Sequence, residues 1–441
     1  RVRSSAASDV YKRQVMTIEE TEHGETSSLP DHKCPVTTSF MEHKVQSEPW
    51  EFIAELHESC PVHRVPETGV WLMVNYEASK EALLTPEIFS STVRAASGHQ
   101  AEKLRLHQEI LNKEGWGHVL TLQRTDPPVH THYRKLINRV FTPRRVAAMA
   151  PNIDAVANSL IDAFVDSGEC EFASEFAMPL PGIITTEQLG LDRSQIYTFK
   201  KWADAMLAPS MRLLTEEEVR EVAEIELEAQ RHFAQEFEKR RESPSDDLIS
   251  ALVHSHEEGE EPLSIAELQN LMHQLITGGF ETTTSALAHG IWLLIEYPET
   301  QKMLRSNPEL IENFIEEALR FWSPVQGLAR MTTEDTEVCG TTIPSGSMVS
   351  VRYGAANRDP EQFKNPEEFD ITRKDNGGHL AFGFGAHFCP GASLARQELK
   401  SAFTALLQRS EWFEFAKPLS DPAHEPSFFL LPLEEMHIKI K

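Results

Sequence analysis

The strongest hydrophobic pattern in the chain predicts one long helix between residues 264 and 297. Ser264 and Glu267 form the capping box that begins many helices, and Leu263 can pack on Leu268 as a hydrophobic staple. Apolar residues then recur every three or four positions, at Leu268, Leu271, Met272, Leu275, Ile276, Leu287, Ile291, Leu294 and Ile295. So continuous an apolar face predicts a helix that is mostly buried.

The remaining pattern predicts many helices and a few short strands. Alternating runs at 62–64 and 70–74 flank a turn at 66–69, which predicts a strand pair, and a short helix is predicted over 77–84. Helical spacing dominates from about residue 144 to 307, and further strand patterns occur at 336–351 and near the C-terminus. We therefore expect a mainly α fold with small β-sheets (α+β), as a single large domain over residues 36–441.

Residues 1–35 lie outside this pattern, and we expect a disordered leader there. Residues 1–14 have no apolar periodicity and look like translated sequencing-adapter sequence, so residues 1–15 are expected to be an artefact that precedes a start at Met16. Residues 19–28 are acidic and polar, a composition that cannot bury enough apolar surface to fold.

Composition and charge narrow the possible function classes. A net charge of −26 argues against general binding to nucleic acid or to an anionic membrane, because both need clustered positive charge. No apolar run approaches the roughly 18 residues of a membrane span. The five cysteines are widely spaced, which fits a reducing cytoplasm and no disulfides. We expect a cytoplasmic protein.

The most informative segment for chemistry surrounds Cys389. Gly383, Gly385 and Gly391 let the backbone turn lie close to a flat ligand, and a helix pattern begins directly after the cysteine. A helix N-terminus favours the negative charge of a thiolate, which is the form that binds metals. A structural cysteine needs no such glycines, and a zinc site usually has a second Cys or His pair at short spacing. A nucleotide-binding loop would need a third glycine and a following acidic residue.

The pattern Phe-Gly-x-Gly-x-His-x-Cys-x-Gly over residues 382–391 resembles the heme-ligand loop of the cytochrome P450 family of heme-thiolate monooxygenases. The resemblance implies a cytochrome P450 fold, with heme b (iron protoporphyrin IX) as cofactor. It implies that Cys389 ligates the iron as a thiolate, and that Phe382, Gly383, His387 and Gly391 help to bind the heme.

The middle of the long helix carries residues that weaken helices. Two glycines and three threonines lie within residues 278–284, where each glycine costs about 1 kcal/mol relative to alanine. Close packing against another helix is one explanation. The other is a groove: Gly278 and Thr282 share a face, so the threonine hydroxyl can bond the Gly278 carbonyl and open the helix over a flat cofactor. The segment resembles the family's oxygen-binding motif, which implies that Thr282 donates a hydrogen bond to the reacting oxygen and that Glu281 relays protons.

Two further groups of charged residues match the family's pattern. Glu317 and Arg320 share a helix face, and with Arg373 they resemble a conserved structural triad, although such pairs are usually solvated surface charges. The heme propionates are carboxylates, which need cationic or hydrogen-bond donor groups. The residues that resemble the family's propionate-binding groups are His130, Arg134, Arg330 and His387.

The resemblance covers residues 36–441 and implies a bacterial heme-thiolate monooxygenase. Such an enzyme inserts one atom of O2 into a lipophilic small molecule, with electrons from a separate ferredoxin and an NAD(P)H-dependent ferredoxin reductase, since the chain has no fused redox module. A peroxide-driven peroxygenase, a rearrangement enzyme and a non-catalytic heme-binding sensor remain alternatives.

Two surfaces of the enzyme are expected from the same resemblance. The substrate pocket is expected to be mostly apolar and to include Phe280, Phe428 and Phe429, in the segments 92–119, 202–211, 271–280, 325–328 and 427–430. A basic patch is expected to steer an acidic ferredoxin toward the heme, unless its members are ordinary solvated side chains: Arg124, Lys135, Arg139, Arg144, Arg145, Arg396 and Lys400.

Overall fold

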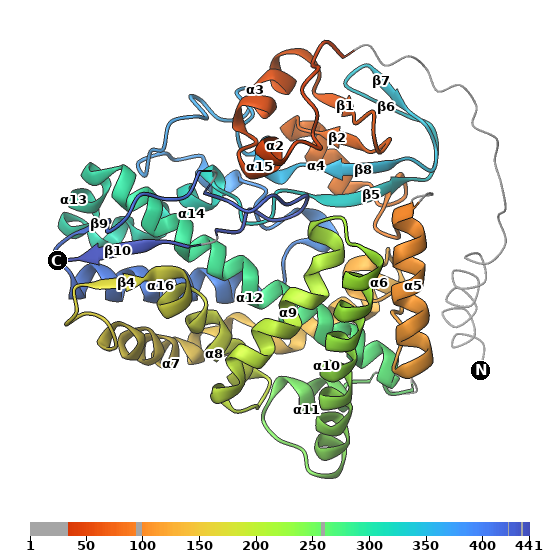
Figure 1. The fold of residues 1–441 in the computed structure, drawn as a ribbon, viewed down its shortest axis with the longest axis horizontal. Coiled ribbons are helices and arrows are strands. Elements are labelled where there is room, and N and C mark those ends of the chain that lie inside the picture. Colours follow the sequence, from red (N-terminus) through yellow and green to blue (C-terminus); the bar gives the residue numbers. More distant parts are fainter. Residues whose placement is uncertain (1–33, 94–98, 257–260, 422, 434) are drawn as a thin grey trace.

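The computed structural model of the chain describes residues 34–93, 99–256, 261–421, 423–433 and 435–441. Figure 1 shows most of the strands gathered with several short helices at the top of the molecule, a separate small sheet at its left side, and long helices filling much of the rest. The predicted mainly α fold with small sheets is confirmed. None of the helices in the described ranges has the length and apolar character needed to cross a membrane. Nearly all of the expected leader lies outside the described residues.

The described helices are, in chain order, α2 (His43–Ser47), α3 (Trp50–Ser59), α4 (Tyr76–Leu84), α5 (His99–Glu114), α6 (Val129–Val140), α7 (Pro143–Asp162), α8 (Pro179–Gln188), α9 (Ile196–Met211), α10 (Glu216–Glu242), α11 (Leu248–Val253), α12 (Ile265–Glu296), α13 (Pro298–Ser306), α14 (Ile311–Phe321), α15 (Tyr353–Ala356) and α16 (Ala392–Arg409). Short 3-10 turns include η1 (Leu122–Arg124) and η6 (Gly385–His387). The predicted short helix over 77–84 is confirmed as α4, whose first turn is capped by the Asn75 side chain.

The described strands are β1 (Val62–Arg64), β2 (Trp71–Met73), β3 (Phe89–Ser90), β4 (Glu169–Glu171), β5 (Leu328–Thr332), β6 (Thr336–Val338), β7 (Thr341–Ile343), β8 (Met348–Val351), β9 (Phe413–Phe415) and β10 (His437–Ile440). Five of them form one sheet in the order β1-β2-β8-β5-β3. The predicted strand pair is confirmed, because β1 and β2 pair antiparallel with Val62 opposite Met73. The turn between them contains Gly69 at φ 71°, a conformation that favours glycine.

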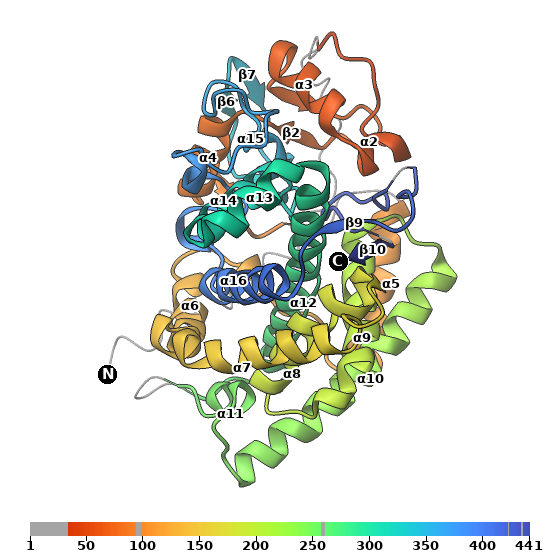
Figure 2. The ribbon, with the colours of Figure 1, turned by 90° about the vertical axis from the view of Figure 1, so that its left-hand side faces the viewer.

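Helix α12 joins two hydrophobic cores. Its capping box at Ser264 and Glu267 is confirmed, and the helix ends at Glu296. The N-terminal half packs with α6, α9, α10 and α11 through residues such as Leu271 and Phe280. The C-terminal half packs with α7, α8, α14 and α16 through residues such as Leu287. Figure 2 shows α12 passing through the middle of the molecule beside α16. The glycines and threonines of residues 278–284 therefore lie at the joint between the two cores.

A buried ion cluster fixes α14 to the segment that follows the sheet. Arg320 donates two hydrogen bonds of 2.8 Å to the Glu317 carboxylate, and both side chains are fully buried. Arg373 adds a bond of 3.2 Å to the same carboxylate. The predicted Glu317–Arg320–Arg373 triad is confirmed, and these groups are not solvated surface charges. Burying them is tolerable only because each charge is paired and hydrogen-bonded.

The ion cluster also holds the start of the cysteine loop. Arg320 donates to the Asn357 carbonyl at 2.9 Å, and the Asn357 side chain accepts a hydrogen bond of 2.6 Å from the Leu380 amide. The same side chain donates to Ser323 Oγ at 2.8 Å. Asn357 and Leu380 are fully buried, so no water competes for these bonds. The position of the loop that carries Cys389 thus depends on the cluster around Glu317.

Glu317→Gln should lower the free energy of unfolding by about 3–5 kcal/mol, because it leaves buried guanidinium groups without their anion. Glu312→Gln on the same helix is the matched control: its side chain is exposed and paired with Lys400, so its loss should cost less than about 1 kcal/mol. Urea denaturation followed by circular dichroism measures both. Equal losses in the two variants would contradict a structural role for the triad.

Candidate functional site

The Cys389 loop is shaped by glycines and by contacts with its neighbours. Gly383 and Gly385 have φ of 69° and 68°, and a Cβ at Gly385 would lie 2.6 Å from the Leu83 carbonyl oxygen, so only glycine fits. The Cys389 amide donates to the Phe382 carbonyl at 2.9 Å. Helix α16 begins at Ala392, and a Cβ at Gly391 would lie 3.8 Å from Cys389 Sγ. The predicted turn and helix around the cysteine are therefore present.

The sulfur of Cys389 is in an environment that opposes a free thiolate. Desolvation raises the pKa of the thiol above its ordinary value, and the Gly391 amide and the Arg134 and Arg396 guanidinium groups only partly offset this effect. A bound metal cation stabilises a thiolate far more than these donors do. The sulfur is thus suited to be a metal ligand rather than a free nucleophile.

Four basic side chains gather beside the loop from three parts of the chain. His130 and Arg134 lie on α6, Arg330 on β5 and His387 in η6. The His130 and His387 ring centroids are 4.1 Å apart, and Arg134 Nη1 donates to the Phe388 carbonyl at 2.6 Å. Electrostatic interactions of His387 with His130, Arg330 and Arg134 show that the four lie together. The structure therefore brings the four predicted residues into one group.

The four basic side chains form a site that is suited to bind an anion. Desolvation, reinforced by Arg134, lowers the pKa of His130 to about 4, and desolvation with the three basic neighbours lowers that of His387 to about 3. His130 is 3% exposed, and its Nε2 is buried without a hydrogen-bond partner. His387 Nε2 bonds Ser91 Oγ at 3.0 Å. Two carboxylates at this place would match the donor set, so these residues fit heme propionates.

The predicted groove in α12 is also present. Thr282 Oγ1 donates to the Gly278 carbonyl at 2.6 Å, as expected from their spacing. Gly278 is exposed within a helix whose other faces are mostly buried, and a Cβ there would meet no atom within 4 Å. Gly279 is different, because its Cβ would lie 3.2 Å from Thr185 Oγ1 on α8. Helix packing therefore explains Gly279, and the open side of Gly278 fits a flat cofactor.

Glu281 points away from the groove toward α9. Lys200 Nζ lies 3.4 Å from Glu281 Oε2, and Lys200 also pairs with Asp204. Desolvation raises the pKa of Glu281, although Lys200 partly offsets the effect. The side chain of Glu281 is 13% exposed and that of Asp204 is 52% exposed. The three groups thus form a charged path from α12 to the surface, which sequence reasoning missed because α9 is distant in the chain.

Sequence reasoning also missed Glu398. This α16 residue is 2% exposed and hydrogen-bonds Thr283 of α12, the neighbour of Thr282. Burial raises the pKa of the carboxyl to about 8, and the Thr283 bond only partly offsets this. The local sequence has no signal of this burial, because Glu398 lies in the mostly polar run Arg-Gln-Glu-Leu-Lys at 396–400 and most helical glutamates are exposed.

The candidate pocket segments are partly brought together. Val325 pairs with Leu430, the Gln326 amide donates to the Phe429 carbonyl at 2.8 Å, and the Phe428 amide donates to the Met211 carbonyl at 3.1 Å. The placement of Phe280 in the pocket is wrong: its side chain is fully buried and packs over Gly182 of α8. Residues 94–98 of the first pocket segment lie outside the described residues.

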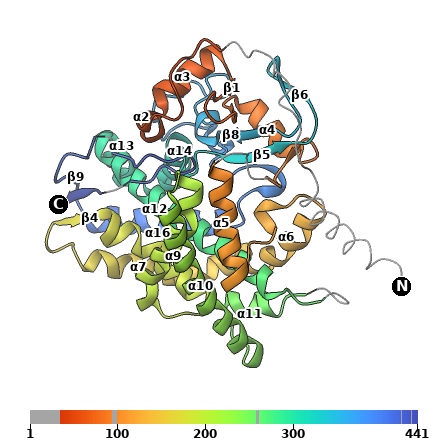
Figure 3. The same cartoon turned by 45° about the vertical axis from the view of Figure 1, so that its right-hand side comes forward.

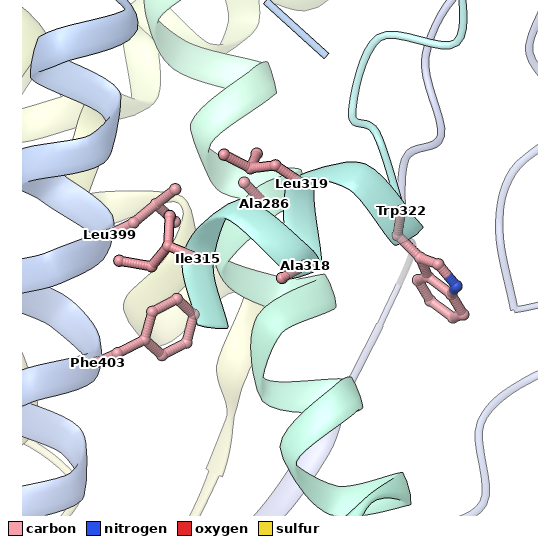
Figure 4. A pocket seen from close by; sticks show the side chains of 7 residues that line it. All are labelled: Ala286, Ile315, Ala318, Leu319, Trp322, Leu399 and Phe403. Atoms are coloured by element: carbon pink, nitrogen blue, oxygen red, sulfur yellow. The ribbon is translucent and has the colours of Figure 1, made fainter. Parts of the chain in front are cut away.

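A separate cavity between α12, α14 and α16 is not a substrate site. Its volume is about 10 Å³, which holds about one water, and Figure 4 shows the side chains that line it. They are Ala286, Ile315, Ala318, Leu319, Trp322, Leu399 and Phe403. An almost wholly apolar lining indicates a small packing defect.

The other cysteines lie away from this site, and none of the five, all of which are among the described residues, forms a disulfide. The sequence argument against zinc concerned the loop of Cys389, which belongs to no cluster of potential metal ligands in the described ranges. Elsewhere the fold brings Cys34 and Cys60 together with His63, with ligand-type atoms within 4.8 Å of one another, although the two cysteines are far apart in the sequence.

Comparisons with known proteins agree with this geometry. A family model described as cytochrome P450 matches residues 185–440. The chain is 34% identical over 394 residues to 6-deoxyerythronolide B hydroxylase of Saccharopolyspora erythraea, covering 88% of this chain and 95% of that protein. It is 33% identical to cytochrome P450 monooxygenase PikC of Streptomyces venezuelae, covering 82% and 84%.

Solved structures are similar over nearly the whole chain. Cytochrome P450 CREJ in complex with (4-ethylphenyl) dihydrogen phosphate has a TM-score of 0.83 at 27% identity, covering 90% of this chain and 98% of that one. CYP109E1 from Bacillus megaterium in complex with testosterone has a TM-score of 0.77 at 30% identity, covering 90% and 98%.

Glu398→Gln should flatten the pH dependence of stability. The folded carboxyl keeps its proton up to about pH 8, whereas an ordinary carboxyl loses it near 4.5, so stability is present at low pH and is lost as pH rises across this window. The slope is at most about 1.4 kcal/mol per pH unit. Urea denaturation at several pH values measures it, with the exposed Glu51→Gln as control. Parallel profiles of wild type and Glu398→Gln would contradict the shift.

Proposed function

Because this chain belongs to the cytochrome P450 family of heme-binding monooxygenases, we propose that it hydroxylates a lipophilic small molecule with O2. We further propose that electrons come from a separate ferredoxin and an NAD(P)H-dependent ferredoxin reductase. The observation that carries the proposal is the grouping of a desolvated sulfur with two guanidinium groups and two neutral imidazoles beside it.

The heme-binding residues follow from this grouping. Cys389 Sγ would ligate the iron, and Phe382, Gly383 and Gly391 would shape the loop that contacts the heme. His130, Arg134, Arg330 and His387 would hold the propionates, which would give His130 Nε2 a hydrogen-bond partner. Gly278 would leave room for the cofactor beside α12. When bound, the heme supplies the iron at which dioxygen is activated.

Protons reach the reaction through residues of α12. Glu281 takes them from solvent by way of Lys200 and Asp204, since desolvation raises its pKa and so favours a carboxyl that can hold a proton. The Thr282 hydroxyl donates its one hydrogen to the Gly278 carbonyl, so it would turn from that carbonyl to donate a hydrogen bond on the open side of the helix. Glu398 holds a second buried proton beside Thr283.

A lipophilic substrate is supported by the apolar pocket segments and by the relatives. One relative is named for the hydroxylation of 6-deoxyerythronolide B, and one similar structure contains testosterone. Another is in complex with a hexadec-9Z-enoic acid ligated acyl carrier protein. An apolar pocket binds such molecules mainly by removing their surface from water.

The positive charge of the expected basic patch is partly neutralised by nearby carboxylates. Arg396 donates to Glu316 at 2.6 Å, Arg145 lies 3.1 Å from Asp246, and Lys400 pairs with Glu312. Arg124 is exposed, but it also interacts electrostatically with Glu226 of α10. Exposed Arg144 remains available to attract an acidic ferredoxin.

Thr282→Ala should divert electrons from product into hydrogen peroxide, because the groove loses its hydroxyl donor. We expect at least a severalfold fall in product formed per NAD(P)H in turnover with a ferredoxin and its reductase. Thr284→Ala is the matched control, since its hydroxyl makes the same type of bond, to the Phe280 carbonyl at 3.0 Å, but is buried. Ligand-induced spectral change measures substrate binding, which should persist in both variants.

Three results would contradict the proposal. Unchanged coupling in Thr282→Ala would remove the proton-donor role. Product formed with hydrogen peroxide but not with ferredoxin and O2 would indicate a peroxygenase or a rearrangement enzyme. Ligand binding without product under any condition would indicate a sensor.

A further inference from the structure

Three histidines surround a buried carboxylate on the side of the molecule where α5 packs on α10. Glu226 lies on α10, His107 on α5, His118 in the segment after α5, and His273 on α12. His118 Nε2 lies 2.6 Å from Glu226 Oε1, and His107 Nε2 lies 3.2 Å from Oε2. The His118 and His273 ring centroids are 5.2 Å apart. Figure 3 shows α5 in front of this part of the molecule, alongside α9 and α10.

Two buried polar atoms of this cluster have no hydrogen-bond partner. Glu226 is 2% exposed and His107 5% exposed, so neither group is well solvated. Although His107 Nε2 and Glu226 Oε2 are close, neither atom makes a hydrogen bond. Buried polar atoms without hydrogen-bond partners are destabilising, so a further partner at this place would stabilise the fold. A cation between the nitrogens and the carboxylate would satisfy both atoms.

The side-chain types match those of metal ligands. A carboxylate and an imidazole both donate lone pairs to a metal, and Glu226 supplies the first while His107, His118 and His273 supply the second.

We propose that Glu226, His118 and His273, with His107 as a fourth ligand, form a binding site for a divalent transition metal such as zinc. One ligand-type atom each from His118, Glu226 and His273 lies within 4.8 Å of the others. Zinc bonds of about 2.0–2.1 Å place tetrahedral ligands about 3.3 Å apart, so small side-chain shifts complete the shell. Imidazole-rich sites select zinc and similar metals over calcium and magnesium, which prefer oxygen.

The metal would cross-link elements that otherwise meet through amide side chains. Gln230 of α10 accepts from the Trp116 amide at 2.9 Å and donates to its carbonyl at 2.8 Å. Gln274 of α12 accepts from the Gln123 amide at 3.0 Å and donates to Thr121 Oγ1 at 2.7 Å. Residues 115–123 are thus already fastened to α10 and α12. Metal at His107 and His118 would fasten α5 and this segment to both helices.

Arg124 is the positive charge that opposes a cation at this site. It interacts electrostatically with both Glu226 and His273. The same charge repels a metal ion, so its removal should strengthen binding. Arg124→Gln should therefore raise the affinity for zinc, whereas the loss of a ligand should lower it.

Zinc binding to the heme-loaded protein without a polyhistidine tag tests the site. After removal of metals with a chelator, calorimetric titration with zinc chloride should show one site per chain, and elemental analysis should find zinc in addition to iron. Zinc should also slow amide hydrogen exchange in α5 and residues 115–123. Loss of a ligand in Glu226→Gln or His118→Gln should weaken binding by more than about tenfold, and Arg124→Gln should strengthen it.

Two matched variants separate this site from other side chains. His254→Gln changes a histidine that bonds the Arg240 carbonyl, and Cys60→Ser changes the cluster of Cys34, Cys60 and His63; neither should alter zinc binding here. Absence of zinc binding to the wild type would overturn the proposal. So would equal affinity of the wild type and Glu226→Gln, or loss of binding only in Cys60→Ser. None of these results depends on turnover.

Discussion

The desolvated sulfur of Cys389 is the constraint on which the rest of the site depends. Desolvation raises the pKa of the thiol, and the surrounding amides and guanidinium groups do not fully compensate. A thiolate is therefore stable only when a cation is bound to it, which ties the ionisation of the sulfur to heme binding. The loop glycines shape the backbone around that sulfur, and the four basic groups on α6, β5 and η6 are the residues that we propose would hold the heme propionates.

The position of that sulfur is fixed through buried polar groups. Glu317 holds Arg320 and Arg373, Arg320 binds the Asn357 carbonyl, and Asn357 accepts from the Leu380 amide at the start of the loop. The polar segment of helix α12 lies between the two hydrophobic cores that pack against its ends. Packing at both ends offsets the low helix propensity of its glycines, and the helix is continuous from Ile265 to Glu296.

Local patterns in the sequence were enough to predict the elements and the residues near Cys389. The capping box of Ser264 and the turn at Gly69 depend on neighbours in the chain, and the triad of Glu317 was found by its resemblance to a family. Sequence reasoning failed where partners are distant. The pairing of Lys200 with Glu281, the burial of Phe280 and Glu398, and the interaction of Arg124 with Glu226 all arise from helix packing that no short pattern encodes.

The most direct test of the account is the absorption spectrum of the reduced protein with carbon monoxide. A thiolate ligand donates electron density to the iron, so the wild type should show the strongly red-shifted Soret band of thiolate-ligated hemes. Cys389→Ser should lose that band, while Cys170→Ser, a buried cysteine elsewhere in the fold, should keep it. A wild-type spectrum like that of a histidine-ligated heme, or a red-shifted band that survives in Cys389→Ser, would contradict the assignment.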